Sequence, residues 1–362
     1  MRLKAVGCRT ALGDSRATCA ALLEGKRALR PLPVLGPDGG DDVPLALSPG
    51  RSLAETAPPN WMPVLLDLAA GIPEGPWGTA RLPVLVTSSN FGVGSLYAFS
   101  RSGDARHLSY GIPSAAVDTL RQLLGWGENV AMVSHACVSA HLGLLLASQW
   151  LGAGLADRAL VFSFDFISPF VTGGFHALKI LNSQMPEPYA DRPTGSIGLG
   201  DGAAFAVLES RGPGFTINAQ CVHNEMHHFT SNRPDGSGFA TCLGAVAAAS
   251  AGRRIWVKGH GTGTLEAGRL EARAVEQLFP GAPLVSWKGS LGHTLGSCGL
   301  VELAVAVEAL RLGRVPGTIG SAAPCFSEAV ATEPFSAAPY DGVLLASNAF
   351  GGAHAAFLVS HD

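Results

Sequence analysis

One cysteine and two histidines in this chain each lie in a short segment of glycine or other small residues. Cys137 stands among small residues just before a long apolar stretch. His260 lies in a glycine- and threonine-rich run, and His293 follows a glycine ahead of a second apolar stretch. A thiol with two imidazoles in reach can form thioesters and move protons on the bound acyl group. Each segment alone is a weak signal, but together they predict thiolate chemistry.

The cysteine is expected at a turn between a strand at 130–134 and a helix at 139–151. A helix N-terminus favours the thiolate and lowers the pKa of Cys137, and its free backbone N–H groups can hold an oxyanion. The usual alternative is a buried structural cysteine. We assign that structural role to Cys8, Cys19, Cys221, Cys242, Cys298 and Cys325.

The two histidines are expected at strand-to-helix junctions. Glycines around His260 let the backbone pass close to a ligand, and the hydroxyls of Thr262 and Thr264 can bind an amide-bearing substrate arm. His293 lies at a helix start, where the dipole disfavours an imidazolium. A neutral ring there can donate a hydrogen bond to a developing enolate.

Other polar residues near these turns have supporting or open roles. Lys288 could tune the imidazole of His293, and Glu302 on the following helix could pair with Lys288. His135, beside the cysteine, could shape the pocket or contact the thiolate. The doublet 227–228 has no partner at metal-ligand spacing, so no metal site is predicted.

Bulk composition narrows the class of protein. The chain has 362 residues, a net charge of −3 and only 15% charged residues, which argues against nucleic-acid binding and is compatible with a large subunit interface. Its seven cysteines form no CxxC pair, so we expect reduced thiols and a cytoplasmic location. The apolar stretch 136–155 is expected to be a buried helix, with no signal peptide or membrane span.

Alternating strand and helix patterns predict an α/β fold with parallel βαβ units. The expected strands are 3–7, 82–87, 130–134, 158–164, 255–258, 284–287 and 343–347, and the expected helices are 15–23, 112–124, 139–151, 266–279 and 299–312. Residues 31–60 are rich in proline, glycine and aspartate and are expected to form irregular structure or a reduced subdomain.

A weak internal repeat relates two glycine turns and the apolar runs after them. Residues 200–210 resemble residues 351–360. The repeat predicts two similar α/β halves, 1–212 carrying the nucleophile and 213–362 carrying both histidines, with the reactive segments where the halves meet.

These segments together resemble the β-ketoacyl-acyl-carrier-protein synthases, the elongating condensing enzymes of the thiolase superfamily. The resemblance covers nearly the whole chain. The matching segments are Gly7–Gly13, Ala136–Cys137, Gly198–Glu209, His260–Thr264 with Glu271, Lys288 with His293 and Glu302, and Asn348–Gly352. The resemblance implies a thiolase-like, five-layered αβαβα fold made of two similar halves.

The resemblance also implies a reaction. Cys137 would take an acyl chain from the phosphopantetheine arm of an acyl carrier protein, with no other cofactor. The backbone N–H groups of Cys137 and Phe350 would form the oxyanion hole, and Phe350 would act as a gate. His260 and His293, with Lys288, would assist decarboxylation of a malonyl unit, whose carbanion attacks the thioester. The implied substrate-binding residues are Thr230, Thr262, Thr264, Phe350 and Gly351, and the implied supporting residues are Glu271 and Glu302.

The chain departs from the family in length and at particular positions. It is shorter between residues 35 and 80, and the stretch 190–194 is truncated, although Arg192 could still contact an acidic carrier. His135 and Trp287 replace residues that are usually small. These changes favour fatty-acid-like, polyketide or polyene secondary metabolism over housekeeping elongation.

Two alternatives remain open. The same fold could support a cysteine-dependent acyltransferase or hydrolase, which needs no decarboxylation. The chain could also be a non-catalytic partner, but such subunits typically lack the cysteine that is present here, so a heterodimer would contain this chain as the active member. We expect an acyl carrier protein and either a second copy or a related synthase-like chain as partners, and neither nucleic acid nor membrane.

Overall fold

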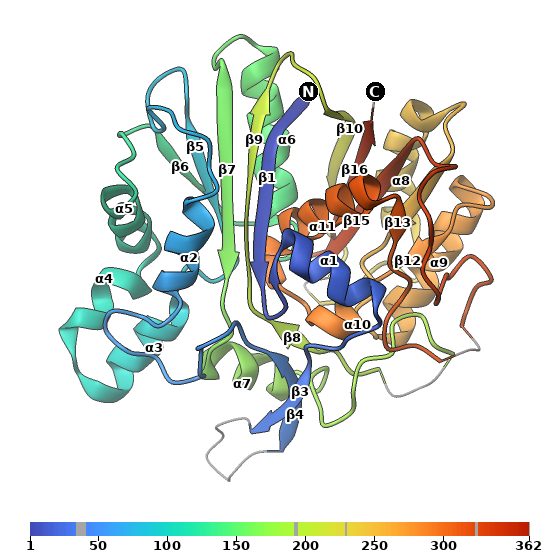
Figure 1. The fold of residues 1–362 in the computed structure, drawn as a ribbon. Coiled ribbons are helices and arrows are strands. Elements are labelled where there is room, and N and C mark those ends of the chain that lie inside the picture. Colours follow the sequence, from blue (N-terminus) through green and yellow to red (C-terminus); the bar gives the residue numbers. More distant parts are fainter. Residues whose placement is uncertain (34–40, 192–194, 229, 323–324, 362) are drawn as a thin grey trace.

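The computed structural model describes residues 1–33, 41–191, 195–228, 230–322 and 325–361 (Figure 1). Within these residues, eleven strands form one mixed sheet. They are β1 (Arg2–Thr10), β2 (Gly13–Asp14), β5 (Val84–Thr87), β6 (Val130–Val133), β7 (Arg158–Asp165), β9 (Gly202–Glu209), β10 (Phe215–Asn224), β11 (Ile255–Lys258), β12 (Leu284–Val285), β15 (Gly342–Ala349) and β16 (Ala353–His361).

The strand order repeats between the two halves of the chain. The first half runs β6-β5-β7-β9-β1 and the second runs β12-β11-β15-β16-β10, which is the same order in terms of chain position. In each half three neighbouring strands are parallel and the closing hairpin is antiparallel. The halves join where β1 pairs with β10, at Leu3 and Phe215. This topology confirms two similar halves, while the exact boundary at 212 and 213 stays a prediction.

The helices complete five layers. They are α1 (Ser15–Leu23), α2 (Met62–Ala69), α3 (Val93–Ser102), α4 (Leu108–Gly111), α5 (Pro113–Leu123), α6 (Ser139–Gly152), α7 (Pro169–Ala177), α8 (Ser237–Ala247), α9 (Leu265–Leu278), α10 (Lys288–Leu291) and α11 (Cys298–Leu312). Helices α6 and α11 contact each other and strands of both halves. Helix α2 packs on β1 and β9, and α8 packs on β10 and β16. The order is helix, first half of the sheet, helix, second half of the sheet, helix, which matches the expected αβαβα architecture.

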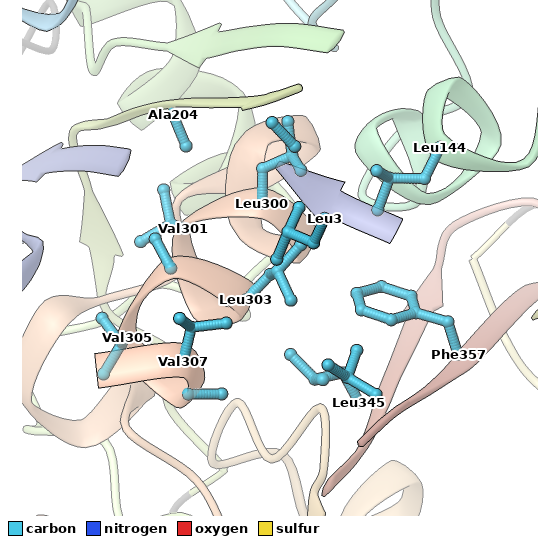
Figure 2. Close-up of a cluster of buried hydrophobic side chains, with 14 of the residues drawn as sticks. Leu3, Leu144, Ala204, Leu300, Val301, Leu303, Val305, Val307, Leu345 and Phe357 are labelled. Carbon is cyan, nitrogen blue, oxygen red and sulfur yellow. The ribbon is translucent and has the colours of Figure 1, made fainter. Parts of the chain in front are cut away.

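Helix α11 is the apolar centre of the molecule. Its side chains are buried on nearly every face. Figure 2 shows Leu300, Leu303 and Val307 among side chains from β1, α6, β15 and β16. Burying one such side chain stabilises a protein by about 1.5–3 kcal/mol relative to leaving it exposed. The helix therefore gives the residues at its N-terminal end a rigid support.

Smaller elements lie outside the large sheet. They are β3 (Arg30–Pro33), β4 (Asp42–Ala46) and β8 (Leu199–Gly200) in one small sheet, the pair β13 (Arg314–Val315) and β14 (Phe335–Ser336), and the 3-10 turns η1 (Ala105–His107), η2 (Ala248–Ser250) and η3 (Leu295–Ser297). Of the two alternatives expected for 31–60, the strands β3 and β4 fit a reduced subdomain and not irregular structure. In the described residues, no helix has both the length and the apolar character needed to cross a membrane.

Candidate functional site

Cys137 lies in a tight turn between β6 and α6. Ala136, directly before it, has a φ of +45°, a backbone conformation that is uncommon for a residue with a side chain. The Ser139 hydroxyl stabilises the turn, because it accepts from the His135 N–H (2.8 Å) and donates to the Ala136 carbonyl (2.6 Å). The structure therefore has the strand-to-helix turn that was predicted around the thiol.

His293 directly contacts the thiol. Its Nε2 lies 2.9 Å from the Cys137 Sγ. Backbone bonds attach this histidine to the segment of β8, because the His293 N–H donates to the Gly198 carbonyl (2.7 Å) and its carbonyl accepts from the Gly200 N–H (3.1 Å). The glycine hairpin of the first half thus positions a histidine of the second half.

His260, which follows β11, lies beside His293. The centres of the two rings are 5.0 Å apart and the rings are nearly perpendicular, at 89°. The turn that carries His260 is held by Glu271 of α9, whose carboxylate accepts from the N–H groups of His260 (2.5 Å) and Gly261 (3.0 Å). The Tyr189 hydroxyl donates to the same carboxylate (2.7 Å). Glu271 therefore supports the turn from behind, at a distance from the thiol chemistry.

Both imidazoles are neutral in this site. Burial lowers the pKa of His293 well below its usual value, and the positive charges of Lys288 and Lys258 lower it further. Burial and Lys288 have the same effect on the pKa of His260. The neutral ring expected for His293 is therefore present, although desolvation is its largest cause.

The pKa of the Cys137 thiol is shifted in the opposite direction from the one expected. Burial raises the pKa of Cys137, and the nearby Cys298 thiol adds to the rise, while the charge of Lys288 opposes it. The lowered pKa inferred from the helix N-terminus is wrong for the resting site, because desolvation of a thiolate outweighs the favourable helix end. A thiol that stays protonated needs a base in contact, and Nε2 of His293 has that position.

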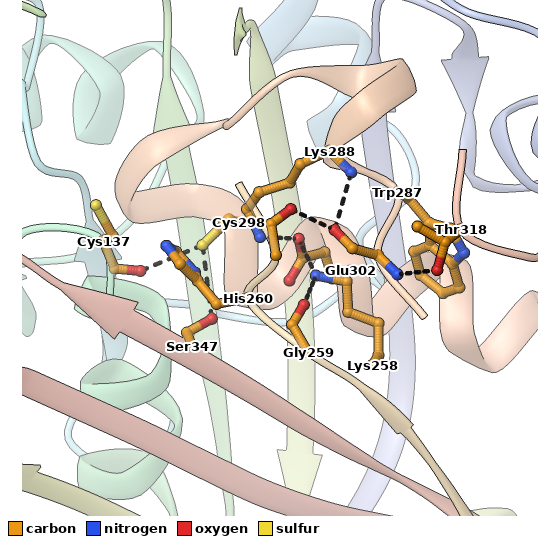
Figure 3. Close-up of polar contacts among 12 residues, drawn as sticks. Cys137, Lys258, Gly259, His260, Trp287, Lys288, Cys298, Glu302, Thr318 and Ser347 are labelled. Carbon is orange, nitrogen blue, oxygen red and sulfur yellow. Dashed lines mark hydrogen bonds and ion pairs between the residues drawn. The ribbon is translucent and has the colours of Figure 1, made fainter. Parts of the chain in front are cut away.

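A buried group of charges lies behind the histidines (Figure 3). The Glu302 carboxylate of α11 accepts from Lys288 Nζ at 2.5 Å, which confirms the expected pair. The ammonium group of Lys258 also contacts this carboxylate and donates to the Gly259 carbonyl (2.7 Å). The sequence analysis missed the role of Lys258. The available signal was a lysine at the end of an otherwise apolar, four-residue strand.

A cavity of about 210 Å³ opens onto the thiol and both imidazoles. The predicted residues on its wall are Cys137, His260, His293, Thr230, Thr262, Thr264 and Phe350. The lining residues that the sequence analysis did not single out include Phe175, Ile180, Ile197, Ser231, Asn232 and Asn348. Gly351 follows Phe350 in a turn with a φ of +85°, and Lys288, Glu271 and Glu302 lie behind the wall. Arg192 lies outside the described residues.

The mouth of the cavity carries an aromatic pair. Phe350 is 36% exposed, and its ring stacks on that of Phe175 with 5.9 Å between ring centres. Since Cys137 and Phe350 both line the cavity, the two residues expected to supply the oxyanion hole face the same space. In the described part of the chain, no three His, Cys, Asp or Glu side chains are grouped so that they could hold a metal ion. The site can thus perform thiol acylation and proton transfer.

Comparisons with known proteins agree with this geometry. Residues 215–322 match the family model described as beta-ketoacyl synthase, C-terminal domain. A 3-oxoacyl-[acyl-carrier-protein] synthase 2 from Coxiella burnetii is 29% identical over 335 residues, which cover 86% of this chain and 78% of the relative. Several other curated relatives match over only 39% to 64% of their own length.

Solved ketosynthases share the fold. A ketosynthase from Xenorhabdus doucetiae, solved in complex with its chain length factor, superposes with a TM-score of 0.79 and 21% identity over 99% of this chain and 97% of that chain. A type II PKS acyl-carrier protein in complex with its ketosynthase, bound to the hexaketide, gives a TM-score of 0.85 and 17% identity over 99% and 98%. The chain is thus similar in sequence to β-ketoacyl-acyl-carrier-protein synthases and shares the fold of solved ketosynthases.

Proposed function

We propose that this chain is a β-ketoacyl-acyl-carrier-protein synthase that performs a decarboxylative Claisen condensation. The observation that carries the proposal is the contact of 2.9 Å between Cys137 Sγ and His293 Nε2, beside a second neutral imidazole and on one open cavity. A nucleophile in contact with its base is the arrangement that covalent acyl transfer requires.

The first step loads the thiol. Cys137 Sγ attacks the carbonyl carbon of an acyl-carrier thioester while its proton moves to His293 Nε2. Backbone N–H groups at Cys137 and Phe350 stabilise the oxyanion. The bond to the carrier sulfur breaks, and the carrier thiol leaves with the proton. The acyl chain is then a thioester of Cys137.

The second step forms the carbon–carbon bond. A malonyl-carrier releases carbon dioxide, and its electron pair remains as an enolate. The neutral rings of His260 and His293 donate hydrogen bonds to the enolate oxygen. The carbanion attacks the Cys137 thioester, the bond to Sγ breaks, and the thiolate takes up a proton from water. The product is a β-ketoacyl-carrier.

The proposal includes an acyl carrier protein, whose pantetheine arm would be held by the hydroxyls of Thr262 and Thr264, which lie 3.4 Å apart on the cavity wall. It also includes a homodimer or a heterodimer with a synthase-like chain. The solved complexes with a carrier and with a chain length factor support both partners. The boundary between halves at 212 and 213, and a cytoplasmic location with reduced cysteines, complete the proposal.

Intact-protein mass spectrometry tests the loading step. We expect an acyl adduct when the protein is mixed with acyl-carrier, and no adduct on Cys137→Ala. Cys298→Ala is the matched control, because it removes the neighbouring buried thiol and should leave the adduct in place. Absence of any adduct with acyl-carriers of several chain lengths would contradict the proposal. Loading without carbon dioxide release from malonyl-carrier would identify an acyltransferase or hydrolase instead.

A further inference from the structure

Two buried lysines, Lys258 and Lys288, share the Glu302 carboxylate behind the histidines, and the steps of the proposed reaction assign no role to Lys258. We propose that Lys258 is a positioning residue for the condensation, which fixes the turn of His260 and adds a second buried positive charge behind the two imidazoles. The inference rests on the proposed function, since Lys258 acts only through residues that perform that reaction.

The contacts of Lys258 explain how it would fix the turn. Its side chain is fully buried at the end of β11 and its Nζ donates to the Gly259 carbonyl at 2.7 Å. That carbonyl belongs to the peptide directly before His260. The Glu271 carboxylate accepts from the His260 N–H of the same peptide and from the Gly261 N–H of the next one. Hydrogen bonds with Lys258 and Glu271 therefore fix the backbone before and after His260, which restricts the orientation of the His260 ring.

The charges around Lys258 do not balance locally. Lys258 and Lys288 both contact Glu302, so two ammonium groups face one carboxylate. A buried charge without a partner costs free energy unless an anion lies near it. Condensation produces such anions, first the oxyanion of the loading step and then the enolate. A positive charge fixed before the reaction stabilises them more strongly in a buried site than in water.

The titratable groups around Lys258 come from several elements. They are Glu302 and Cys298 of α11, Lys288 of α10, His141 of α6, and the two site residues His260 and His293. Burial lowers the pKa of Lys258 to about 8, with Lys288 acting in the same direction and Glu302 opposing. The second charge is thus present at neutral pH and is lost as the pH rises through about 8.

Three proteins test this inference: the wild type, Lys258→Met and Lys258→Arg. The measured quantity is the rate of carbon dioxide release from malonyl-carrier between pH 6 and pH 9.5. We expect the wild-type rate to fall above about pH 8. Lys258→Met should lower the rate at pH 7 by about 10–100-fold, as expected for a displaced catalytic group, and remove the alkaline fall. Lys258→Arg should keep much of the rate and also remove the fall, because a guanidinium does not lose its proton.

Thermal unfolding gives a readout that is independent of activity. The pKa of Lys258 is lowered in the fold from an ordinary value of 10.5, so the unfolded chain binds more protons between about pH 8 and pH 10.5. The wild type should therefore gain stability relative to Lys258→Met as the pH rises through this window. Lys258→Met should fold, because it leaves the balanced pair of Lys288 and Glu302.

The outcomes distinguish failure of the inference about Lys258 from failure of the proposed condensation. Lys26→Met, at an exposed lysine, is the matched control and should match the wild type in rate and pH profile. A wild-type rate that stays level to pH 9.5, or a Lys258→Met profile equal to that of the wild type, would overturn the inference. If the wild type releases no carbon dioxide, the proposed function fails, and the unfolding comparison still decides whether Lys258 carries the surplus charge. If Lys258→Met did not fold, the Lys258→Arg profile would decide.

Discussion

Burial acts in opposite directions on the thiol and on the imidazoles of this site. It raises the pKa of Cys137 and lowers the pKa values of His260 and His293. All three groups are therefore uncharged at rest, and the positive charge of Lys288 opposes a proton on either ring. The thiol and both rings stay uncharged until a substrate arrives, when the proton of Cys137 can move over 2.9 Å to His293.

The neutral imidazoles lead to a prediction about acidic pH. Because both pKa values lie well below 6.5, the rings stay neutral as the pH falls through the usual range of histidine. We expect carbon dioxide release to show no loss centred at pH 6.5, measured between pH 5.5 and pH 7.5 with an internal check that the protein remains folded. A fall with its midpoint at or above pH 6.5 would contradict the assigned protonation state.

Replacing His293 should separate the two steps of the reaction. His293→Ala removes a proton donor and acceptor, which is worth about 10²–10⁴-fold in comparable sites. We expect carbon dioxide release to fall by this factor and loading of Cys137 to fall less, since the backbone N–H groups of the turn remain. Parallel assays of adduct mass and carbon dioxide would show this difference. Equal losses in both assays would mean that His293 acts mainly on loading.

Residue types and spacing were sufficient to predict the thiol and both histidines, because each lies in a local glycine or small-residue turn. They were also sufficient for the pair of Lys288 and Glu302, which lies within one strand-to-helix connection. The contact of Lys258 with Glu302 joins the end of β11 to α11, and the sequence marks Lys258 as a lysine in an apolar strand but does not identify its partner. The direction of the pKa shift of Cys137 depended on burial, which the helix argument did not include.

At the scale of elements, backbone approach at Gly292 determines where His293 lies. A Cβ on Gly292 would lie 2.5 Å from the carbonyl carbon of Leu199, and the residue has a φ of +72°. We expect Gly292→Ala to destabilise the fold and to lower carbon dioxide release by about 100-fold, because a shift of 1 Å in a catalytic group has that effect. Gly103→Ala is the control, since its φ is +71° but no atom lies within 4 Å of the added carbon. Thermal unfolding and the carbon dioxide assay should both distinguish the two variants.

Comparison with Gly103→Ala shows whether the close backbone approach at Gly292 matters. The conformational cost of a left-handed residue with a side chain is about 1–2 kcal/mol, and it applies to both glycines. Equal effects of Gly292→Ala and Gly103→Ala on stability and on rate would mean that the approach of β8 does not position His293.

Periodic or fully apolar elements could be predicted from the sequence, and less regular ones could not. The strand at 255–258 and the helix at 15–23 have the predicted bounds. Helix α7 was missed because a Gly-Gly pair weakens its helical pattern. Strand β10 was missed although apolar and polar residues alternate over residues 215–221, a pattern that predicts a strand. Its long pairing with β16 adds to this local preference.

At the scale of the whole molecule, the sheet ends at β6, which pairs only with β5 in the described residues. Met132 on this edge strand is 49% exposed. An uncovered apolar edge strand is a ready template for pairing with another chain. The edge therefore fits the dimer included in the proposed function, with either a second copy or a related chain.

A charge on this edge should weaken association. We expect Met132→Lys to shift the protein from dimer to monomer in size-exclusion chromatography with light scattering, because a buried lysine would oppose pairing of β6. Leu312→Lys, at another exposed apolar side chain, should leave the dimer intact. A dimer of unchanged stability in Met132→Lys would exclude the β6 edge as the contact.

The most direct test of the account follows the carbon atoms through condensation. The protein is mixed with an acyl-carrier and a malonyl-carrier labelled in its free carboxyl group, and mass spectrometry measures labelled carbon dioxide and the carrier products. The account predicts equal amounts of labelled carbon dioxide and β-ketoacyl-carrier, and neither condensation product nor acyl adduct with Cys137→Ala. Carbon dioxide without any β-ketoacyl-carrier, or condensation by Cys137→Ala, would contradict it.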